Sequence, residues 1–242
     1  LLARVPLITG PEGPEPVAST REPSGKPVFA ASLSADSDSV ETLPRLLSQD
    51  IHLSSFIKVP GKDNGLDIEG LAVIGSRVFL GLRGPVLRGW ALIIEIQPRP
   101  SNADPTKLEL GPINDLNGPS YTKHFLDLHG LGIRDLARHG DDLLILAGPT
   151  MILDGPSRVL RLRRGAHDPL PEVVTHSQLE QIGPDLPITT EHDRPVKAGH
   201  DHPEAITILD HDPQQQLLVL YDSPTKQRSK NNKILADLIP LP

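Results

Sequence analysis

The sequence of 242 residues contains no cysteine, few aromatic residues and no long apolar run. Without cysteine the chain has no disulfide framework, no thiolate metal site and no cysteine nucleophile. This fits a reducing compartment but does not exclude a secreted one. Because no apolar stretch approaches the ~18 residues of a membrane-spanning helix, we expect a soluble chain with no membrane partner.

Positive charge is also scarce, since 24 Lys and Arg stand against 31 Asp and Glu and the formal net charge is −7. Proteins that bind nucleic acid neutralise phosphates with a basic face. The two basic stretches, Arg161 to Arg164 and Lys226 to Lys233, have the pattern of solvated surface. We therefore expect no nucleic acid partner.

Sequence motifs for several enzyme classes are missing too. There is no Gly-x-Ser-x-Gly elbow, no Walker sequence and no Rossmann glycine fingerprint. The chain starts at Leu1 without a charged-then-apolar leader, so we expect processing or truncation upstream. The compartment stays open, with the cytoplasm slightly favoured and export as the alternative.

Turn-forming residues, in contrast, are plentiful. The 20 glycines and 26 prolines favour many turns between short strands. Residues 1–27 are rich in Pro, Gly and Glu without a hydrophobic period, which predicts an irregular or mobile lead-in. We predict a strand at 28–33 and one or two helical turns at 40–47, where Pro44 limits the helix.

One pattern occurs three times, at 67–85, 132–149 and 202–224. Each copy has a charged residue among apolar ones, then a turn, then an apolar strand ending in Gly-Pro or Ser-Pro. Self-similarity of this kind indicates a repeat architecture. The equivalent charged residues are Glu69, Arg134 and Glu204.

We therefore predict an all-β chain, a β-propeller that is incomplete here, with about three clear four-stranded blades plus part of another. The propeller domain would cover 28–242, with repeat units at about 61–128, 129–198 and 199–242. The alternative is a β-sandwich, which would not be expected to repeat one pattern. Outer strands of the first two blades are predicted at 123–128 and 172–176, and Pro-rich loops at 97–120 and 183–203. The inner, second and third strands of the successive units are predicted at 68–74, 77–82 and 90–96, at 133–138, 142–147 and 158–163, and at 204–209, 216–221 and 233–239.

The first strand of each propeller blade lines the central channel, so equivalent positions converge there. Glu69, Arg134 and Glu204 would meet in one small space, as the polar groups of a binding site do. Simple solvation of a wet channel, or pairing of Glu69 with Arg134, is an equally weighted alternative. Further charged or imidazole side chains are expected nearby, namely Asp67, Asp135, His200 and His202.

Residues that could act as metal ligands occur in two of the repeats. In an extended chain His200, His202 and Glu204 would share a face and suit zinc, iron or manganese, although Pro203 interrupts regular pairing. Oxygen ligands that calcium or magnesium prefers follow Asp63 in the first repeat. The spacing is not that of an EF-hand, and Asn64-Gly65 reads more plainly as a turn. The candidate cofactor is a divalent cation such as calcium, with the candidate ligands Asp67, Glu69, His202 and Glu204.

Arginines flank the turn after the second strand of the first repeat. Arg83 and Arg88, beside glycines, could hold a phosphate or carboxylate, and the alternative is pairing with surface carboxylates. The predicted substrate-binding residues are Arg83, Arg134 and Asp135.

The stretch from Lys62 to Ala72, followed by Gly81 to Pro85, resembles the DUF3616 proteins, a bacterial family of unknown function. The likeness continues through 130–136, 146–149 and further motifs up to Pro224. It implies a β-propeller-like domain without an assigned reaction, in a family whose members are longer at the amino end. A shorter Ile-Glu-Gly-Leu element is similar to one in esterase-like phytase propellers, and implies a metal or phosphate role for Glu69.

Our first functional hypothesis is a small anionic or metal-associated ligand at the channel mouth, with hydrolysis of a phosphoester or ester as the reaction. Glu69 and Glu204 would be metal ligands or a general base, while Arg83 and Arg134 would offset charge on the substrate.

The alternative hypothesis is a non-catalytic interaction or scaffold propeller that contacts another protein through loops 97–120 and 183–203. A structural extracytoplasmic protein is a third possibility. The sequence leaves the oligomeric state open.

Overall fold

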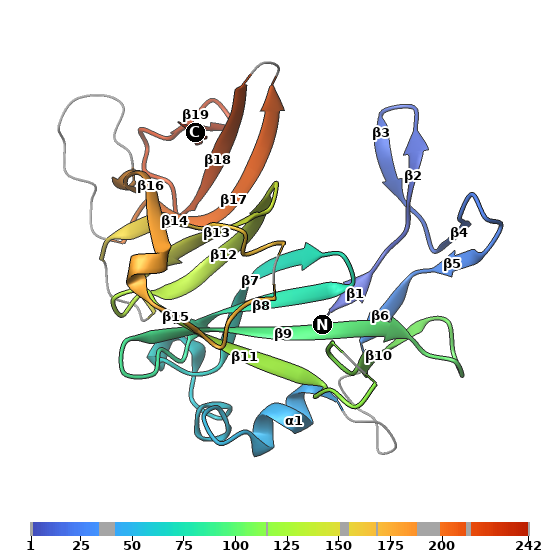
Figure 1. Cartoon of the computed structure of the whole chain (residues 1–242). Coiled ribbons are helices and arrows are strands. Elements are labelled where there is room, and N and C mark those ends of the chain that lie inside the picture. The colour runs from blue at the N-terminus through green and yellow to red at the C-terminus, as the bar shows by residue number, and fades with distance from the viewer. Residues whose placement is uncertain are drawn as a thin grey trace. The chain divides into compact units, whose positions relative to one another are not determined.

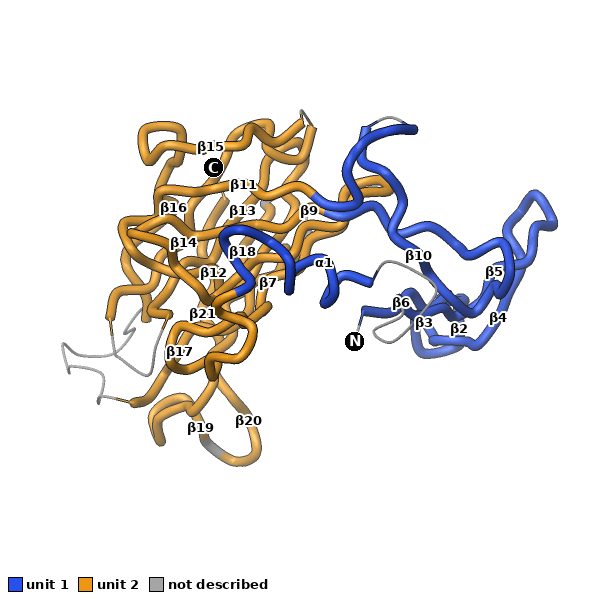
Figure 2. Tube along the Cα trace, turned by 90° about the horizontal axis from the view of Figure 1, so that it is seen from below, with its two compact units in different colours: residues 1–54, 96–121 blue, residues 55–95, 122–242 orange. Residues whose placement is uncertain are grey.

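The computed structural model describes residues 2–33, 42–114, 116–150, 155–167, 169–187, 199–211 and 214–241. It confirms an all-β chain, in which α1 (Leu43–Gln49) is the only α-helix of the described residues (Figure 1). The chain divides into two compact units, shown in Figure 2. Unit 1 is made of Leu1–Ser54 and Ile96–Tyr121, and unit 2 is made of Ser55–Glu95 and Thr122–Pro242. None of the helices in the described part of the chain could span a membrane.

Unit 1 contains two hairpins in the segment predicted as an irregular lead-in. Strand β2 (Leu7–Gly10) pairs with β3 (Gly13–Pro16), and β4 (Ser19–Arg21) pairs with β5 (Pro27–Phe29). Gly13, the first residue of β3, has a positive φ of 130°, a conformation that glycine adopts at little cost. The glycines and prolines that indicated a loop therefore lie in the turns and the strands of hairpins.

Strand pairing joins the two chain segments that make up unit 1. Strand β1 (Ala3–Arg4) is antiparallel to β6 (Ala31–Leu33), and β6 is parallel to β10 (Lys107–Gly111). Strand β10 is antiparallel to the last residues of β9 (Trp90–Pro100). The predicted loop 97–120 thus contains strand residues at both of these places.

Helix α1 matches the helical turns predicted at 40–47, except that Val40 and Glu41 lie outside the described residues. Pro44 stands in the first turn, where its missing N–H would have no helical partner anyway. After the helix, Asp50 accepts a hydrogen bond from the hydroxyl of Tyr121 at 2.5 Å. Burial and this hydrogen bond raise the pKa of Tyr121.

Unit 2 holds three successive sheets, one for each copy of the repeat, called here the first, second and third sheet. The first sheet has the strand order β7-β8-β9-β11-β15, the second β12-β13-β14-β16 and the third β17-β18-β21. A separate hairpin joins β19 and β20. The bounds not yet given are β7 Asp67–Ile74, β8 Arg77–Gly84, β11 Tyr121–Asp127, β12 Gly132–His139, β13 Asp142–Gly148, β14 Ser157–Leu162, β15 Val173–Val174, β16 Leu179–Leu186, β17 His202–His211, β18 Gln214–Asp222, β19 Ser229–Lys230, β20 Lys233–Ile234 and β21 Asp237–Pro240, with short 3₁₀ helices at Ser54–Phe56, Gly61–Asp63 and His176–Gln178.

The outer strands agree only in part with the prediction. The strand expected at 123–128 is β11, which is the fourth strand of the first sheet. The one expected at 172–176 is wrong as an outer strand of the second sheet, because β15 pairs with β11 and β16 takes that place. Strand β16 contains Pro184, which led us to predict a loop, but an edge strand tolerates proline.

In the third sheet the strand expected at 233–239 is divided. Its beginning belongs to the β19–β20 hairpin, and only β21 pairs with β18. Of the predicted loop 183–203, the first residues belong to β16, while 188–198 lie outside the described residues.

The second sheet is buried on both faces, because it packs between the other two. Leu143, Ile145 and Ala147 belong to the apolar core shared with the first sheet. Leu144 and Leu146 point to the opposite side and belong to the core shared with the third sheet. Burial on both faces explains the unbroken apolar run in β13. The structure therefore shows an all-β unit whose second sheet packs against two others, and it does not confirm a complete propeller.

Candidate functional site

The first strand of each sheet in unit 2 is interrupted by a β-bulge, in which one extra residue stands opposite the neighbouring strand. The register breaks between Ile68 and Gly70, between Ile133 and Asp135, and between Pro203 and Ala205. The extra residues are Glu69, Arg134 and Glu204. The three equivalent charged positions of the repeat are thus the three bulged positions. A bulge changes the direction in which a side chain points, compared with its direction in a regularly paired strand.

These side chains form one chain of ion pairs. Arg134 Nη1 donates to Glu204 Oε1 at 2.6 Å and to Glu69 Oε2 at 3.2 Å. The other oxygen of Glu69 accepts a hydrogen bond from Arg83 Nη1 at 2.8 Å, and the same nitrogen lies 3.5 Å from Asp67 Oδ2. We call these five residues, Asp67, Glu69, Arg83, Arg134 and Glu204, the charged cluster. The sequence prediction that distant carboxylates and a guanidinium meet is confirmed.

Arg83 also binds the backbone of the residue that follows the second repeat. Its Nε donates to the carbonyl oxygen of Thr150 at 3.1 Å, and the Thr150 hydroxyl donates to Asn64 Oδ1 at 3.0 Å. Asn64 has a φ of 65°, which confirms the predicted turn with positive φ. Its Oδ1 also accepts the backbone N–H of Val86 at 2.9 Å. The turn residue therefore holds the segment that follows β8, the strand that carries Arg83.

Arg134 crosses the strand beside it at a glycine. A Cβ on Gly148 would lie 3.1 Å from Arg134 Cγ and 3.0 Å from the hydroxyl oxygen of Ser157. The missing side chain leaves the space through which Arg134 reaches the carboxylates. Arg134 Nε is buried and has no hydrogen-bond partner among the described residues.

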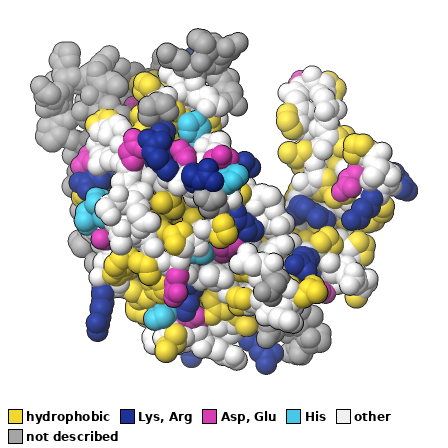
Figure 3. Space-filling view, viewed as in Figure 1, with side chains coloured by type: hydrophobic (Ala, Val, Ile, Leu, Met, Phe, Trp, Pro, Cys, Tyr) yellow, Lys and Arg dark blue, Asp and Glu magenta, His cyan; other side chains and the backbone are white. Residues whose placement is uncertain are grey.

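The cluster is layered, with its cations inside and its carboxylates outside. The exposed side-chain fractions are 7% for Arg134 and 10% for Arg83, against 31% for Asp67 and 33% for Glu204. Three carboxylates against two guanidiniums leave one negative charge when all are ionised. Burial raises the pKa of Glu204, with Glu69 adding to the effect and Arg134 opposing it. Elsewhere on the face seen in Figure 3, acidic and basic side chains lie close together over unit 2.

Asp135, which we predicted to bind substrate, accepts hydrogen bonds from two backbone N–H groups. Its Oδ1 accepts the N–H of Leu136 at 2.8 Å and its Oδ2 accepts the N–H of Ile206 at 2.9 Å. Burial raises its pKa, and these backbone hydrogen bonds oppose the shift. Asp135 thereby joins β12 to β17 directly beside the charged cluster.

We expect Asp135→Asn to lower the free energy of unfolding by about 1–3 kcal/mol, measured by urea denaturation. An amide NH₂ cannot accept the second backbone N–H, so one buried donor loses its partner. Asp141→Asn is the control, because the Asp141 side chain is 56% exposed and pairs at 3.6 Å with His167, which is similarly exposed. Equal stability of the two variants would contradict the linking role of Asp135.

We expect the stability of the wild type to fall relative to Glu204→Gln as the pH rises. Because burial raises the pKa of Glu204, its protonated form favours the folded state. That contribution is complete below the ordinary pKa of a glutamate and is lost as the pH rises through the raised pKa. Gln cannot ionise, so thermal unfolding across this pH range should show the difference. The exposed Glu172→Gln variant should follow the wild type; parallel curves for Glu204→Gln would refute the expectation.

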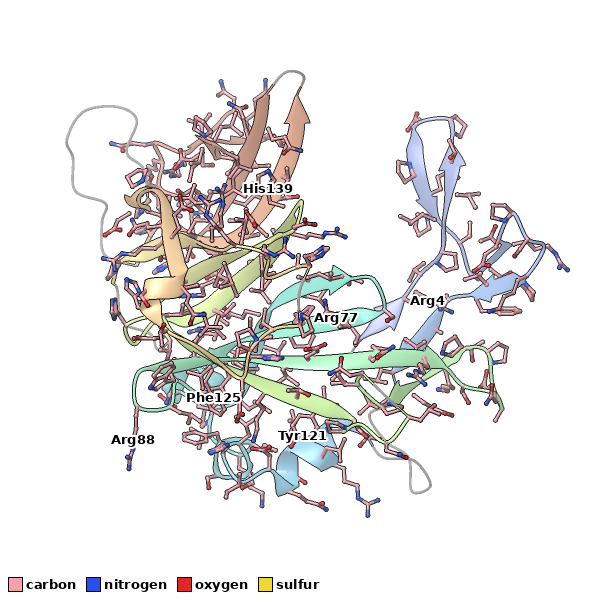
Figure 4. The ribbon with its side chains drawn as sticks, in the orientation of Figure 1. Arg4, Arg77, Arg88, Tyr121, Phe125 and His139 are labelled. Atoms are coloured by element: carbon pink, nitrogen blue, oxygen red, sulfur yellow. The ribbon has the colours of Figure 1, made fainter. Side chains whose placement is uncertain are left out.

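The other candidate ligands are not gathered with the cluster into a metal cage. No group of three or more His, Asp or Glu that could hold a metal ion is found in the described residues. His200 Nδ1 contacts the carbonyl oxygen of Ser223 at 3.1 Å, and Asp63 lies in the 3₁₀ helix before the turn. Arg88 is exposed and extends away from the ribbon (Figure 4). The metal role of His202 stays a prediction.

Sequence reasoning missed a second buried polar group in unit 2. His124 Nε2 lies 3.0 Å from Glu95 Oε2, and His124 Nδ1 lies 3.0 Å from the carbonyl oxygen of Pro171. Arg77 approaches the other oxygen of Glu95 at 3.6 Å. The one available signal was Glu95 itself, a lone carboxylate inside the apolar run of β9.

A comparison with protein families found one match. The model of a family described as a protein of unknown function, DUF3616, matches residues 1–237. No curated protein and no solved structure matched the chain.

Proposed function

We propose a ligand-binding function for this chain, which belongs to the DUF3616 family of proteins of unknown function. The three stacked sheets would be blades of a β-propeller-type frame, and the charged cluster would lie at its channel mouth. The ligand would be a small anionic molecule, such as a phosphoester, that arrives with a divalent cation. The layering of the cluster, with carboxylates outside and guanidiniums inside, is the observation that carries this proposal.

The layering favours a metal-associated ligand over a bare anion. A ligand that approaches from solvent meets carboxylate oxygens first, and a cluster with an excess negative charge repels a free anion. Glu204 pairs with Arg134 through Oε1, and its other oxygen, for which the described residues show no hydrogen bond, would bind the cation. Magnesium is commonly held by only one or two carboxylates, together with water and substrate phosphate, so a cage of three protein ligands is not required.

Ester or phosphoester hydrolysis is the reaction for which we propose the same residues. Glu204 would accept the proton of the attacking water as the water oxygen bonds to the phosphorus or carbonyl carbon, and it would return that proton to the leaving alcohol oxygen as the ester bond breaks. Burial raises the pKa of Glu204, which favours its acceptance of a proton. Arg134 would then stabilise the negative charge that develops on the substrate. A bound cation would polarise the phosphoryl or carbonyl oxygen.

Binding is tested by thermal unfolding and titration calorimetry with magnesium or calcium chloride, inorganic phosphate, and the two together. We expect the combination to raise the melting temperature of the wild type more than either component alone, because ligands that bind the folded state stabilise it. Glu204→Gln and Asp67→Asn should remove most of the increase. Glu172→Gln, an exposed residue outside the cluster, is the matched control. The same increase in all four proteins, or none in the wild type, would refute the proposal.

A further inference from the structure

Two histidines that are distant in the sequence lie face to face in unit 2. The ring centroids of His129 and His176 are 3.8 Å apart, and the ring planes are inclined to each other at 37°. His129 follows β11, and His176 begins the 3₁₀ helix that precedes β16. The His129 side chain is 54% exposed, and His176 is partly buried. These two residues, called here the histidine pair, therefore bring two imidazoles together near the surface.

Ordered turns hold both members of the histidine pair in place. His129 has a φ of 55°, and its backbone N–H donates to Asp127 Oδ1 at 3.2 Å. A side-chain turn of this kind supports a positive φ, which residues other than glycine seldom adopt. The 3₁₀ helix of His176 begins with a capping box, in which the backbone N–H of Thr175 donates to Gln178 Oε1 at 2.9 Å. The backbone on either side thus fixes where each ring begins.

Asp127 contacts the same nitrogen of both rings. His176 Nδ1 lies 3.4 Å from the backbone carbonyl oxygen of Asp127, and His129 Nδ1 lies 3.5 Å from its Oδ1. Because both of these oxygens accept hydrogen bonds, each neutral ring carries its proton on Nδ1 and a lone pair on Nε2. No hydrogen bond to either Nε2 is formed by the residues that the structure describes. The histidine pair therefore offers two nitrogen lone pairs on the sides of the rings away from Asp127.

Histidines that bind metal ions have the same surroundings. A metal-binding histidine usually donates its other ring N–H to a carboxylate or a backbone carbonyl, which fixes the tautomer and the ring orientation. Asp127 supplies one acceptor of each kind. Imidazole nitrogen suits zinc, copper and nickel, whereas magnesium and calcium prefer oxygen. We propose that the histidine pair binds a divalent transition metal such as zinc through Nε2 of His129 and Nε2 of His176, with Asp127 orienting both rings.

The protein would supply two ligands at this site. The described residues contain no group of three or more side chains that could hold a metal ion, so water or an oxygen of a bound ligand would take the remaining positions. A metal ion lies in the plane of each imidazole that binds it, so the stacked rings would turn toward an edge-on arrangement. The last torsion of a histidine side chain is broad, and the exposed ring of His129 has room to turn. None of these residues belongs to the charged cluster, so the proposal does not depend on the proposed function.

Titration calorimetry and thermal unfolding with zinc chloride test the site, on protein without a histidine tag. We expect zinc to bind the wild type and to raise its melting temperature, because a ligand of the folded state stabilises it. His129→Asn and His176→Gln should each weaken binding by about tenfold or more, since even the loss of an orienting partner typically costs about 10–100-fold. Asn is chosen at 129 because it tolerates a positive φ. His167→Gln is the matched control, because that side chain is 53% exposed and lies 3.6 Å from one carboxylate, Asp141, and it should bind zinc like the wild type.

Two further measurements identify the ligands. Electron paramagnetic resonance of the copper complex should show two coordinated nitrogens in the wild type and one fewer in either histidine variant. An excess of magnesium, the cation expected at the charged cluster, should leave zinc binding unchanged, and displacement by magnesium would indicate carboxylate ligands and overturn the inference. Circular dichroism checks that each variant is folded. A wild type that binds no zinc, or folded His129→Asn and His176→Gln proteins that bind it as tightly as the wild type, would also overturn it.

Discussion

Replacing Arg134 by Met is expected to lower the free energy of unfolding by about 2–4 kcal/mol. Removing one partner of a buried ion pair typically costs about 3–5 kcal/mol, because the remaining charge is left uncompensated. The lower value applies because Glu204 and Glu69 are partly exposed, so water offsets part of the loss. In the variant, both carboxylates would keep their mutual repulsion and lose the guanidinium that joins them.

The matched control is Arg158→Met, in which an exposed ion pair is removed. Arg158 bonds Asp185 through Nε at 2.8 Å, but the two side chains are 30% and 48% exposed. Exposed pairs contribute about 0–1 kcal/mol, so this variant should lose little. Both are measured by urea denaturation at neutral pH. Combining Arg134→Met with Glu204→Gln should recover part of the loss, because it removes the charge of Glu204, whose ion-pair partner is Arg134, whereas Glu69 keeps its ion pair with Arg83. Equal losses for the two arginines would contradict a central role for Arg134.

The convergence of Glu69, Arg134 and Glu204 could be predicted because these residues occupy the same position in a repeated sequence pattern. If three segments have the same sequence pattern, they adopt the same local structure, and equivalent residues occupy equivalent places in each sheet. The contacts of Arg134 with both glutamates confirm this. Their chemical role does not follow from the same reasoning, because ion pairing alone also accounts for the contacts.

The bulges could not be predicted from the sequence. A bulge adds one residue to a strand, and its position depends on the pairing partner rather than on the residue itself. The pairing makes Leu82, Ala147 and Tyr221 equivalent, but the Gly-Pro or Ser-Pro end follows two residues after Leu82 and Tyr221 and one residue after Ala147. The pairing of Glu95 with His124 could not be predicted from the sequence either, since no repeated pattern connects these two positions.

The hairpins of unit 1 and strand β16 show a different limit. In both, proline and glycine were interpreted as signs of a loop, but the residues lie in turns or on strand edges, where they are tolerated. Pro184 in β16 and Gly13 at the start of β3 are the particular cases. Local composition indicates a reversal of the chain without showing whether the flanking residues pair.

Gly132→Ala is expected to cost about 3 kcal/mol or more, among the largest effects of a single added methyl group in this chain. A Cβ on Gly132 would overlap the carbonyl oxygen of Arg83, which is backbone and cannot rotate away. Strand β12 must then move relative to β8. Since Arg83 and Arg134 stand on these two strands, the shift would also disturb the ion pairs of both with Glu69.

The comparison with Gly140→Ala separates this clash from the general cost of replacing a glycine. Gly140 has a φ of 59° with nothing within 4 Å of an added Cβ, so its variant loses about 1–2 kcal/mol through backbone strain alone. Gly132 has no positive φ, so a larger loss there, measured by urea denaturation, can come only from the contact between the strands. The Gly132 variant should also lose the cation-dependent rise in melting temperature, and the Gly140 variant should keep it. A loss at Gly132 no greater than that at Gly140 would show that β8 and β12 are not held as closely as the structure requires.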